Sequence, residues 1–170
     1  MIRNINFNKY FIEMPGELTL RDPKILLATW FGSGLSRKAP GTMGSLASIP
    51  LGFLLMYFFG IPGLLVGIFF CIWIGTDAAH YYMHQTGKDD PPEIVIDETL
   101  GMWIAAIPAG TQWQVWVVAF LLFRYFDIKK PWPASYYDKK RKGAWAVMMD
   151  DVIAGLYALL GTSMVALLYM

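Results

Sequence analysis

The sequence predicts an all-α, polytopic helical membrane protein. Hydrophobic residues make up 56% of its 170 residues and charged residues only 16%, which is far from the composition of a typical soluble domain. The apolar residues come in long blocks rather than in one-sided stripes, and such blocks are typical of membrane spans. We expect a polar N-terminal arm over residues 1–20, followed by a single membrane-embedded domain over residues 21–170.

Turn residues and hydropathy predict about four transmembrane helices, an amphipathic N-terminal helix and one short or tilted helix. The amphipathic helix is expected over residues 22–36 and the short helix over residues 97–107. At 1.5 Å per residue the short helix reaches only about 16 Å, so it cannot cross about 30 Å of hydrocarbon upright. The expected spans cover residues 43–59, 64–82, 112–127 and 147–170, with a basic loop over residues 129–143.

Lysine and arginine residues predict the orientation of the chain. Six of them lie in residues 1–40 and six in residues 129–143, whereas the turns at 60–63 and 108–112 contain none. Because cytoplasmic loops carry an excess of lysine and arginine, we place the basic loops in the cytoplasm. The polar loop over residues 85–96 falls on the same side. All polar helix ends then lie at the cytoplasmic face.

Two pairs of acidic residues interrupt strongly apolar segments. Asp97-Glu98 follows the letters IVI, and Asp150-Asp151 follows AVMM. Either pair alone can be read as a helix N-cap favoured by the macrodipole. Unpaired carboxylates are costly in apolar surroundings, and these four together with Asp127 would repel one another without a cation. Mg²⁺ prefers oxygen ligands and keeps waters for a phosphate substrate, so all five acids are candidate Mg²⁺ ligands.

Arg124, Asp127 and Lys130 recur at intervals of three residues. This spacing places them on one stripe of a helix until Pro131 ends it. One reading is an interfacial arginine and lysine whose charges extend to the membrane surface, with Asp127 ion-paired to them. The other reading places Asp127 on the metal, and Lys130 and Arg124 on phosphate oxygens.

The segment PGTMGS over residues 40–45 is a glycine-containing turn into a helix. Free backbone N–H groups at such a helix start bind anions. Gly41, Thr42, Gly44 and Ser45 are therefore candidate phosphate-binding residues. An ordinary N-cap at Thr42 or Ser45 is the alternative, and the P-loop pattern G-x-x-x-x-G-K-[ST] is absent.

A further polar group lies near the end of the second expected span. Asp77, His80 and His84 are spaced so that they share roughly one helix face. Two histidines suit a zinc site or a general base, but such a face also packs against polar neighbours. Their role stays open.

Several motifs together resemble the phosphatidylglycerophosphatase A family. They are FGSGLS at 31–36, PGTMGSL at 40–46, Asp97-Glu98 with GMW at 101–103, FR at 123–124 with Asp127 and KPWP at 130–133, and DDVIAG at 150–155, with HQT at 84–86 and Lys88-Asp89 also fitting. The resemblance covers about residues 22–160 in the same order and at similar spacing. The N-terminal arm and Arg37-Lys38 depart from the pattern.

The resemblance implies an all-helical, Mg²⁺-dependent phosphatase of the bacterial inner membrane. Such an enzyme removes the terminal phosphate of phosphatidylglycerophosphate to give phosphatidylglycerol, a step of phospholipid biosynthesis. The nucleophile is left open between metal-activated water and a carboxylate. The expected catalytic residues are Asp97, Glu98, Asp127, Lys130, Asp150 and Asp151, and the expected phosphate-binding residues are Gly41, Thr42, Gly44, Ser45, Arg124 and Lys130.

Two other classes of function compete with a phosphatase. A small transporter or channel also concentrates charge in the membrane, but it needs polar groups at mid-membrane and on both sides, and one side here lacks ionisable residues. A lipid-headgroup phosphotransferase also uses metal-binding acids, but its D-G-x-x-A-R pattern is missing. No nucleic-acid partner is expected. The number of metal ions, the oligomeric state and the activity on other lipid phosphates stay open.

Overall fold

The structure is a computed structural model that describes residues 10–16, 18–140 and 142–169. Residues 1–9 and 17 of the expected N-terminal arm lie outside the described residues. The described part of the chain is all-helical apart from one isolated antiparallel bridge between Phe11 and Ser36. The predicted all-α class is therefore confirmed.

The N-terminal helix is shorter than the expected range of residues 22–36. Helix α1 covers only Pro23–Ala28 and begins with Pro23 after Asp22, whose side chain accepts a hydrogen bond from the Lys24 N–H at 2.8 Å. The chain then turns because Trp30 and Phe31 both adopt positive φ values, of 42° and 57°. A short 3₁₀ helix, Ser33–Leu35, precedes the next long helix.

Helix α2 (Pro40–Phe70) folds back on itself at the predicted turn. Gly60 has φ 63° and ψ −158°, which breaks the helical geometry. Leu55 and Gly67 would be about 18 Å apart along a straight helix, yet a Cβ built on Gly67 would lie 2.9 Å from Leu55 Cδ1. The second arm of α2 continues through a π-helical segment, Cys71–Gly75, into α3 (Thr76–Thr86).

Four further helices complete the described chain. The short helix α4 (Ile96–Ala106) matches its prediction closely. A 3₁₀ turn at Ile107–Ala109 leads to α5 (Trp113–Lys129), and the chain ends with α7 (Ala144–Ala166) and a 3₁₀ turn at Leu167–Tyr169. Helix α6 (Ala134–Lys140) lies where the sequence predicted only a basic loop, so that expectation was wrong.

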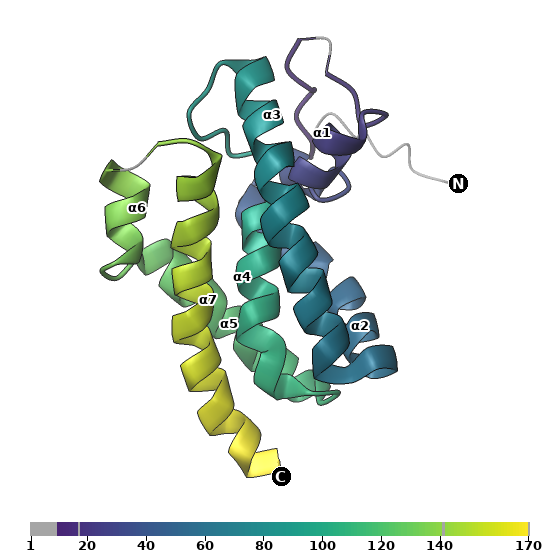
Figure 1. The fold of residues 1–170 in the computed structure, drawn as a ribbon, viewed down its shortest axis with the longest axis vertical. Coiled ribbons are helices and arrows are strands. Elements are labelled where there is room, and N and C mark those ends of the chain that lie inside the picture. The colour runs from purple at the N-terminus through teal and green to yellow at the C-terminus, as the bar shows by residue number, and fades with distance from the viewer. Residues whose placement is uncertain (1–9, 17, 141, 170) are drawn as a thin grey trace.

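Helix α4 forms the centre of the bundle, with α7 and α5 on one side and α2 on the other (Figure 1). Every residue of α4 except Glu98 is buried. Helices α4 and α7 pack with their backbones in contact, because a Cβ built on Gly155 would lie 2.6 Å from the Gly101 carbonyl oxygen. Small residues allow such close helix contacts.

Two helical segments are long and apolar enough to cross a membrane. They cover residues 40–86 and 144–169, with mean hydropathies of 2.3 and 1.9. Only 22% and 28% of their most apolar windows are buried, whereas the core helix of a soluble protein would be mostly buried. The expected count of four spans is not confirmed, since the structure offers two candidates and α5 has only 17 residues.

The polar helix ends gather at one end of the bundle. The α3–α4 and α6–α7 connections lie at this end, and the fold-back of α2, the α4–α5 turn and the C-terminus lie at the opposite end (Figure 1). The N-termini of α2, α4 and α7 and the C-terminus of α5 therefore meet, and this meeting point holds the candidate site.

Candidate functional site

A pocket of about 370 Å³ opens where these four helix ends meet. Its wall contains all five predicted acids and both predicted cations. The predicted residues that line it are Gly41, Asp97, Glu98, Arg124, Asp127, Lys130, Asp150 and Asp151. Residues from four helices, separated by up to 110 positions in the chain, thus converge on one cavity.

Two of the acids are neutralised by the chain's own cations. The Lys130 Nζ lies 2.6 Å from Asp150 Oδ2, and the Arg124 Nη1 lies 2.5 Å from Asp127 Oδ2. All four side chains are largely shielded from solvent, with the two aspartates less than a tenth exposed. Pairs with this much burial are screened less than surface ion pairs. They fix the position of both cations at the pocket wall.

The remaining three acids form a separate cluster of carboxylates. Asp97, Glu98 and Asp151 each offer a carboxylate oxygen, and these oxygens all lie within 4.8 Å of one another. Burial and the neighbouring Glu98 raise the pKa of Asp97. Burial raises the pKa of Glu98 to about 8. The Glu98 Oε2 atom is buried and has no hydrogen-bond partner.

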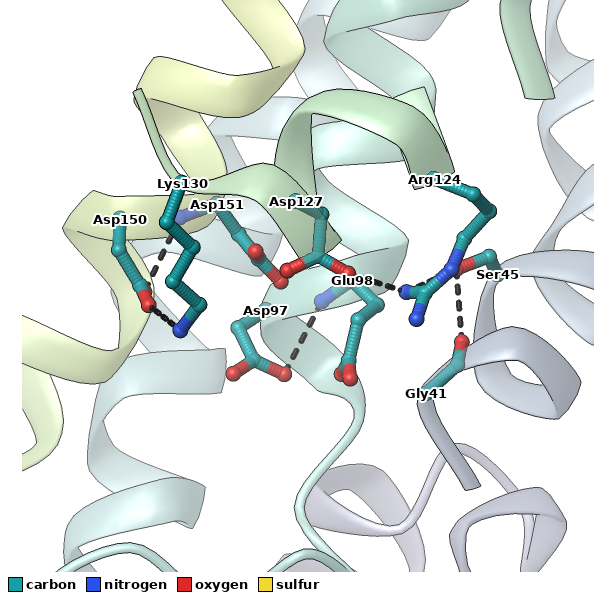
Figure 2. Close-up of polar contacts among 9 residues, drawn as sticks. All are labelled: Gly41, Ser45, Asp97, Glu98, Arg124, Asp127, Lys130, Asp150 and Asp151. Atoms are coloured by element: carbon teal, nitrogen blue, oxygen red, sulfur yellow. Dashed lines mark hydrogen bonds and ion pairs between the residues drawn. The ribbon is translucent and has the colours of Figure 1, made fainter. Parts of the chain in front are cut away.

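This cluster fits a hard divalent cation. Its donor atoms are all carboxylate oxygens, which suit Mg²⁺, Ca²⁺ or Mn²⁺ rather than a soft metal. The Glu98 Oε2 atom has no hydrogen-bond partner. The three clustered carboxylates repel one another, and a bound cation would offset this repulsion. Figure 2 shows the acids in a row, with Asp150 and its partner Lys130 toward one end and Arg124 toward the other.

Close backbone packing sets the geometry of the cluster. A Cβ built on Gly101 of α4 would lie 2.7 Å from the carbonyl oxygen of Asp151 in α7. Asp97 lies one turn before Gly101 on the same helix. The glycine therefore lets α7 approach α4 closely enough for Asp151 to reach Asp97.

The start of α2 forms another wall of the pocket. Ser45 Oγ donates a hydrogen bond to the Gly41 carbonyl at 2.7 Å and accepts one from Arg124 Nη1 at 3.3 Å. A Cβ on Gly41 would collide with Glu98 Oε1 and lie 3.2 Å from Arg124 Nη1. Arg124 and Glu98 approach position 41 so closely that a side chain there would collide with them, and glycine avoids this collision.

The structure decides against the N-cap alternative for this segment. The N-cap of α2 is Ala39, which has φ 48° and makes no side-chain capping bond, and Pro40 is the first helical residue. Thr42, Gly44 and Ser45 do not line the pocket, although Ser45 contacts Arg124, which does. Gly44 instead packs against the segment before α4, because a Cβ there would lie 2.5 Å from Val95 Cβ.

Capping does not explain the second acid pair either. Helix α7 begins at Ala144, three residues before the predicted start, and its first turn contains no acid. Asp150 and Asp151 therefore lie in the second turn, beyond the reach of the N-terminal dipole. Asp97 and Glu98 do lie in the first turn of α4, whose N-cap is Val95 without a side-chain capping bond.

The third polar group lies outside the pocket. Asp77 pairs with Lys24 of α1 at 2.8 Å, and both side chains are substantially exposed. His80 and His84 are also exposed and do not line the pocket. Among the described residues, the cluster of potential metal ligands consists of the three carboxylates and contains no histidine.

Sequence reasoning missed several parts of the pocket wall. Asp90 lines it from the loop before α4, and its position in the acidic and proline-rich string KDDPP was the available signal. Ala39, which was not predicted, also lines it. Ala39 and the predicted Lys130 both adopt left-handed backbone geometry directly before a proline, with φ values of 48° and 44°. Residues before proline avoid helical geometry, and strained residues cluster at functional sites.

The fold and the pocket define a class of protein. It is an all-helical protein in which a buried carboxylate cluster suited to a divalent cation is flanked by an arginine and a lysine suited to a phosphate group. The chain belongs to the phosphatidylglycerophosphatase A family, whose profile matches residues 26–166. The resemblance inferred from the motifs is confirmed, and the chain is a member of a phosphatase family.

Curated relatives cover most of the chain. It is 41% identical to the phosphatidylglycerophosphatase A of Haemophilus influenzae over 85% of this chain and 89% of the relative. It is 42% identical to the protein of the same name from Escherichia coli over 82% of this chain and 81% of that relative. A Bacteroides thetaiotaomicron protein, named as a candidate phosphatidylinositol-3-phosphatase, is 36% identical over 79% of this chain and 87% of that relative. No solved structure matches the chain.

Proposed function

We propose that this protein removes the terminal phosphate of phosphatidylglycerophosphate, giving phosphatidylglycerol and inorganic phosphate, in a Mg²⁺-dependent reaction. The observation that carries the proposal is the buried cluster of Asp97, Glu98 and Asp151 between Arg124 and Lys130. Two relatives that are more than 40% identical over most of the chain are named as phosphatidylglycerophosphatase A. The names of these relatives indicate the substrate, and the residues of the pocket indicate metal-dependent phosphate hydrolysis.

Asp97, Glu98 and Asp151 would hold Mg²⁺. When bound there, the ion contributes positive charge to the phosphoryl group and lowers the pKa of nearby water. The five acids predicted as ligands then divide into two groups. Asp127 and Asp150 are paired with cations in the structure, so we assign them to positioning Arg124 and Lys130 in addition to any contact with the metal.

Arg124 and Lys130 would bind the phosphate oxygens. The Arg124 Nε is buried without a hydrogen-bond partner, and an N–H donor left unpaired in this way is available to a phosphate oxygen. Asp127 and Ser45 hold the guanidinium, and Asp150 holds the Lys130 ammonium. Cations held in place before the substrate binds stabilise the charge of phosphoryl transfer without reorganisation.

The proposal places the pocket at the cytoplasmic face of a bacterial inner membrane. Two candidate spans expose their apolar side chains, and the basic segments predicted to be cytoplasmic adjoin the pocket end of the bundle. In this placement α2 crosses as two arms and α7 crosses once. A phospholipid headgroup at that face would reach the pocket while its acyl chains stay in the bilayer.

Release of inorganic phosphate from phosphatidylglycerophosphate in mixed vesicles tests the proposal. We expect release with Mg²⁺, a loss of roughly 10²-fold or more with EDTA, and recovery when Mg²⁺ is restored in excess. Full activity in EDTA would contradict the metal assignment. Phosphatidylinositol 3-phosphate is the matched comparison substrate, and release from this lipid alone would overturn the substrate assignment.

A further inference from the structure

A second, largely apolar groove lies between the start of α7 and the segment that runs from the end of α2 into α3. Its volume is about 820 Å³. One wall is the end of α2 and the segment after it, with Phe69, Ile72 and Trp73, and the other is the start of α7, with Ala144 and Trp145. The two cavities have no lining residue in common.

The groove changes from apolar to polar along its length. Its lining residues on the first wall run from Phe69 to His80, about 16 Å along a helix. The first half of this wall is aromatic and aliphatic, and the second half carries Thr76, Asp77 and His80. Lys142 lines the groove from the residues just before α7. An occupant that matches these walls has a long apolar part and a polar end.

The apolar walls belong to the two candidate membrane spans. Trp73 and Trp145 are 67% and 57% exposed, one on each wall. Tryptophan is enriched where the hydrocarbon meets the headgroup layer. A groove bounded by such residues lies at the depth where a phospholipid passes from its acyl chains to its headgroup.

The polar end contains one acid, Asp77, which pairs with Lys24, and basic residues lie nearby in the sequence. Four consecutive basic residues, Lys139 to Lys142, precede Gly143, the N-cap residue of α7. Clusters of this kind immediately cytoplasmic of a membrane span attract anionic lipids. The Lys142 Nζ contacts Asp89 Oδ2 at 2.7 Å, but both side chains are mostly exposed, and pairs of that kind contribute little and exchange readily.

We propose that this groove binds one anionic phospholipid of the bilayer, separate from the substrate in the catalytic pocket. The acyl chain lies against Phe69, Ile72 and Trp73, and the lipid phosphate lies near Lys142. The inference rests on the membrane placement proposed above and does not require phosphatase activity. It assigns a lipid-binding role to Lys142, which does not line the catalytic pocket.

Native mass spectrometry of the full chain, purified in detergent with equal amounts of phosphatidylglycerol and phosphatidylethanolamine, tests the proposal. We expect one retained lipid per chain, with phosphatidylglycerol preferred. Ile72→Trp fills the groove and should lower retention by about tenfold or more. Lys142→Glu should weaken the preference by about fivefold. Leu160→Trp, at an exposed site on α7 away from the groove, should behave like the unmodified protein.

Three results would overturn the proposal. The first is unchanged retention in Ile72→Trp, or an unchanged preference for phosphatidylglycerol in Lys142→Glu if circular dichroism shows that the tryptophan variant is unfolded. The second is equal retention of both lipids by the unmodified chain. The third is loss of the lipid from Gly41→Ala, which narrows the catalytic pocket, but not from Ile72→Trp. Phosphatase activity measured on the same samples shows separately whether the proposed function holds.

Discussion

Replacing Asp97 with asparagine lowers the rate of phosphate release by roughly 10²–10³-fold, the cost of removing one preorganised electrostatic group from an active site. The variant keeps the size and nearly the shape of the side chain but removes one of three clustered charges. Because that charge is buried beside two other acids, we expect the asparagine variant to be at least as resistant to thermal unfolding without metal as the unmodified protein. Phosphate release and the melting temperature in EDTA measure the two effects.

The matched control for this variant is Asp77→Asn. It makes the same chemical change on an exposed carboxylate that pairs with Lys24 outside the pocket, so activity should stay within about twofold, as expected for an exposed pair. Equal activity of the Asp97 and Asp77 variants would remove Asp97 from the site. A large loss of folding stability in Asp97→Asn would instead mean that the carboxylate has a structural role.

Replacing Gly155 with alanine lowers the free energy of unfolding by about 1–3 kcal/mol, the usual cost of overpacking. The new Cβ would lie 2.6 Å from the Gly101 carbonyl oxygen and 3.0 Å from its Cα, and both are backbone atoms that cannot rotate away. Helices α4 and α7 must therefore separate. Since these helices carry Asp97 and Asp151, activity should also fall, because displacement of about 1 Å can cost roughly 10²-fold.

Gly161→Ala on the same helix is the control for this prediction. A Cβ there would lie 2.8 Å from Leu122 Cδ1, the end of a flexible side chain that can move to another rotamer. We expect its melting temperature in detergent to stay close to that of the unmodified protein. If the Gly155 variant had the same melting temperature and the same rate of phosphate release as the Gly161 variant, the close α4–α7 packing would be refuted.

The sequence was sufficient to predict the helical class and the convergence of charged residues. Three features follow from local sequence patterns and were therefore predictable: the long apolar blocks, the turn at Gly60 and the short helix α4. The positions of the basic residues then placed all the acids at one end of the bundle. This prediction needed only the direction of each helix and no knowledge of helix packing.

Packing and pairing were beyond the reach of sequence patterns. Helix α6 has seven residues and follows a proline-rich turn, so its short sequence carries little periodicity. Hydropathy alone does not distinguish a buried helix from one that faces lipid, so the two candidate segments leave the expected count of four spans unconfirmed. The spacing of Arg124 and Asp127 offered an ion pair as one of two readings, but only side-chain geometry establishes that pair and joins Asp150 to Lys130.

Anomalous diffraction from the protein crystallised with Mn²⁺ tests the central claim most directly. We predict a peak within about 2.0–2.6 Å of carboxylate oxygens from Asp97, Glu98 and Asp151, the distance range of hard cations bound to oxygen. The peak should disappear in Asp97→Asn and persist in Asp77→Asn. A peak on His80 or His84, or no peak at the carboxylate cluster when the enzyme is active, would contradict it.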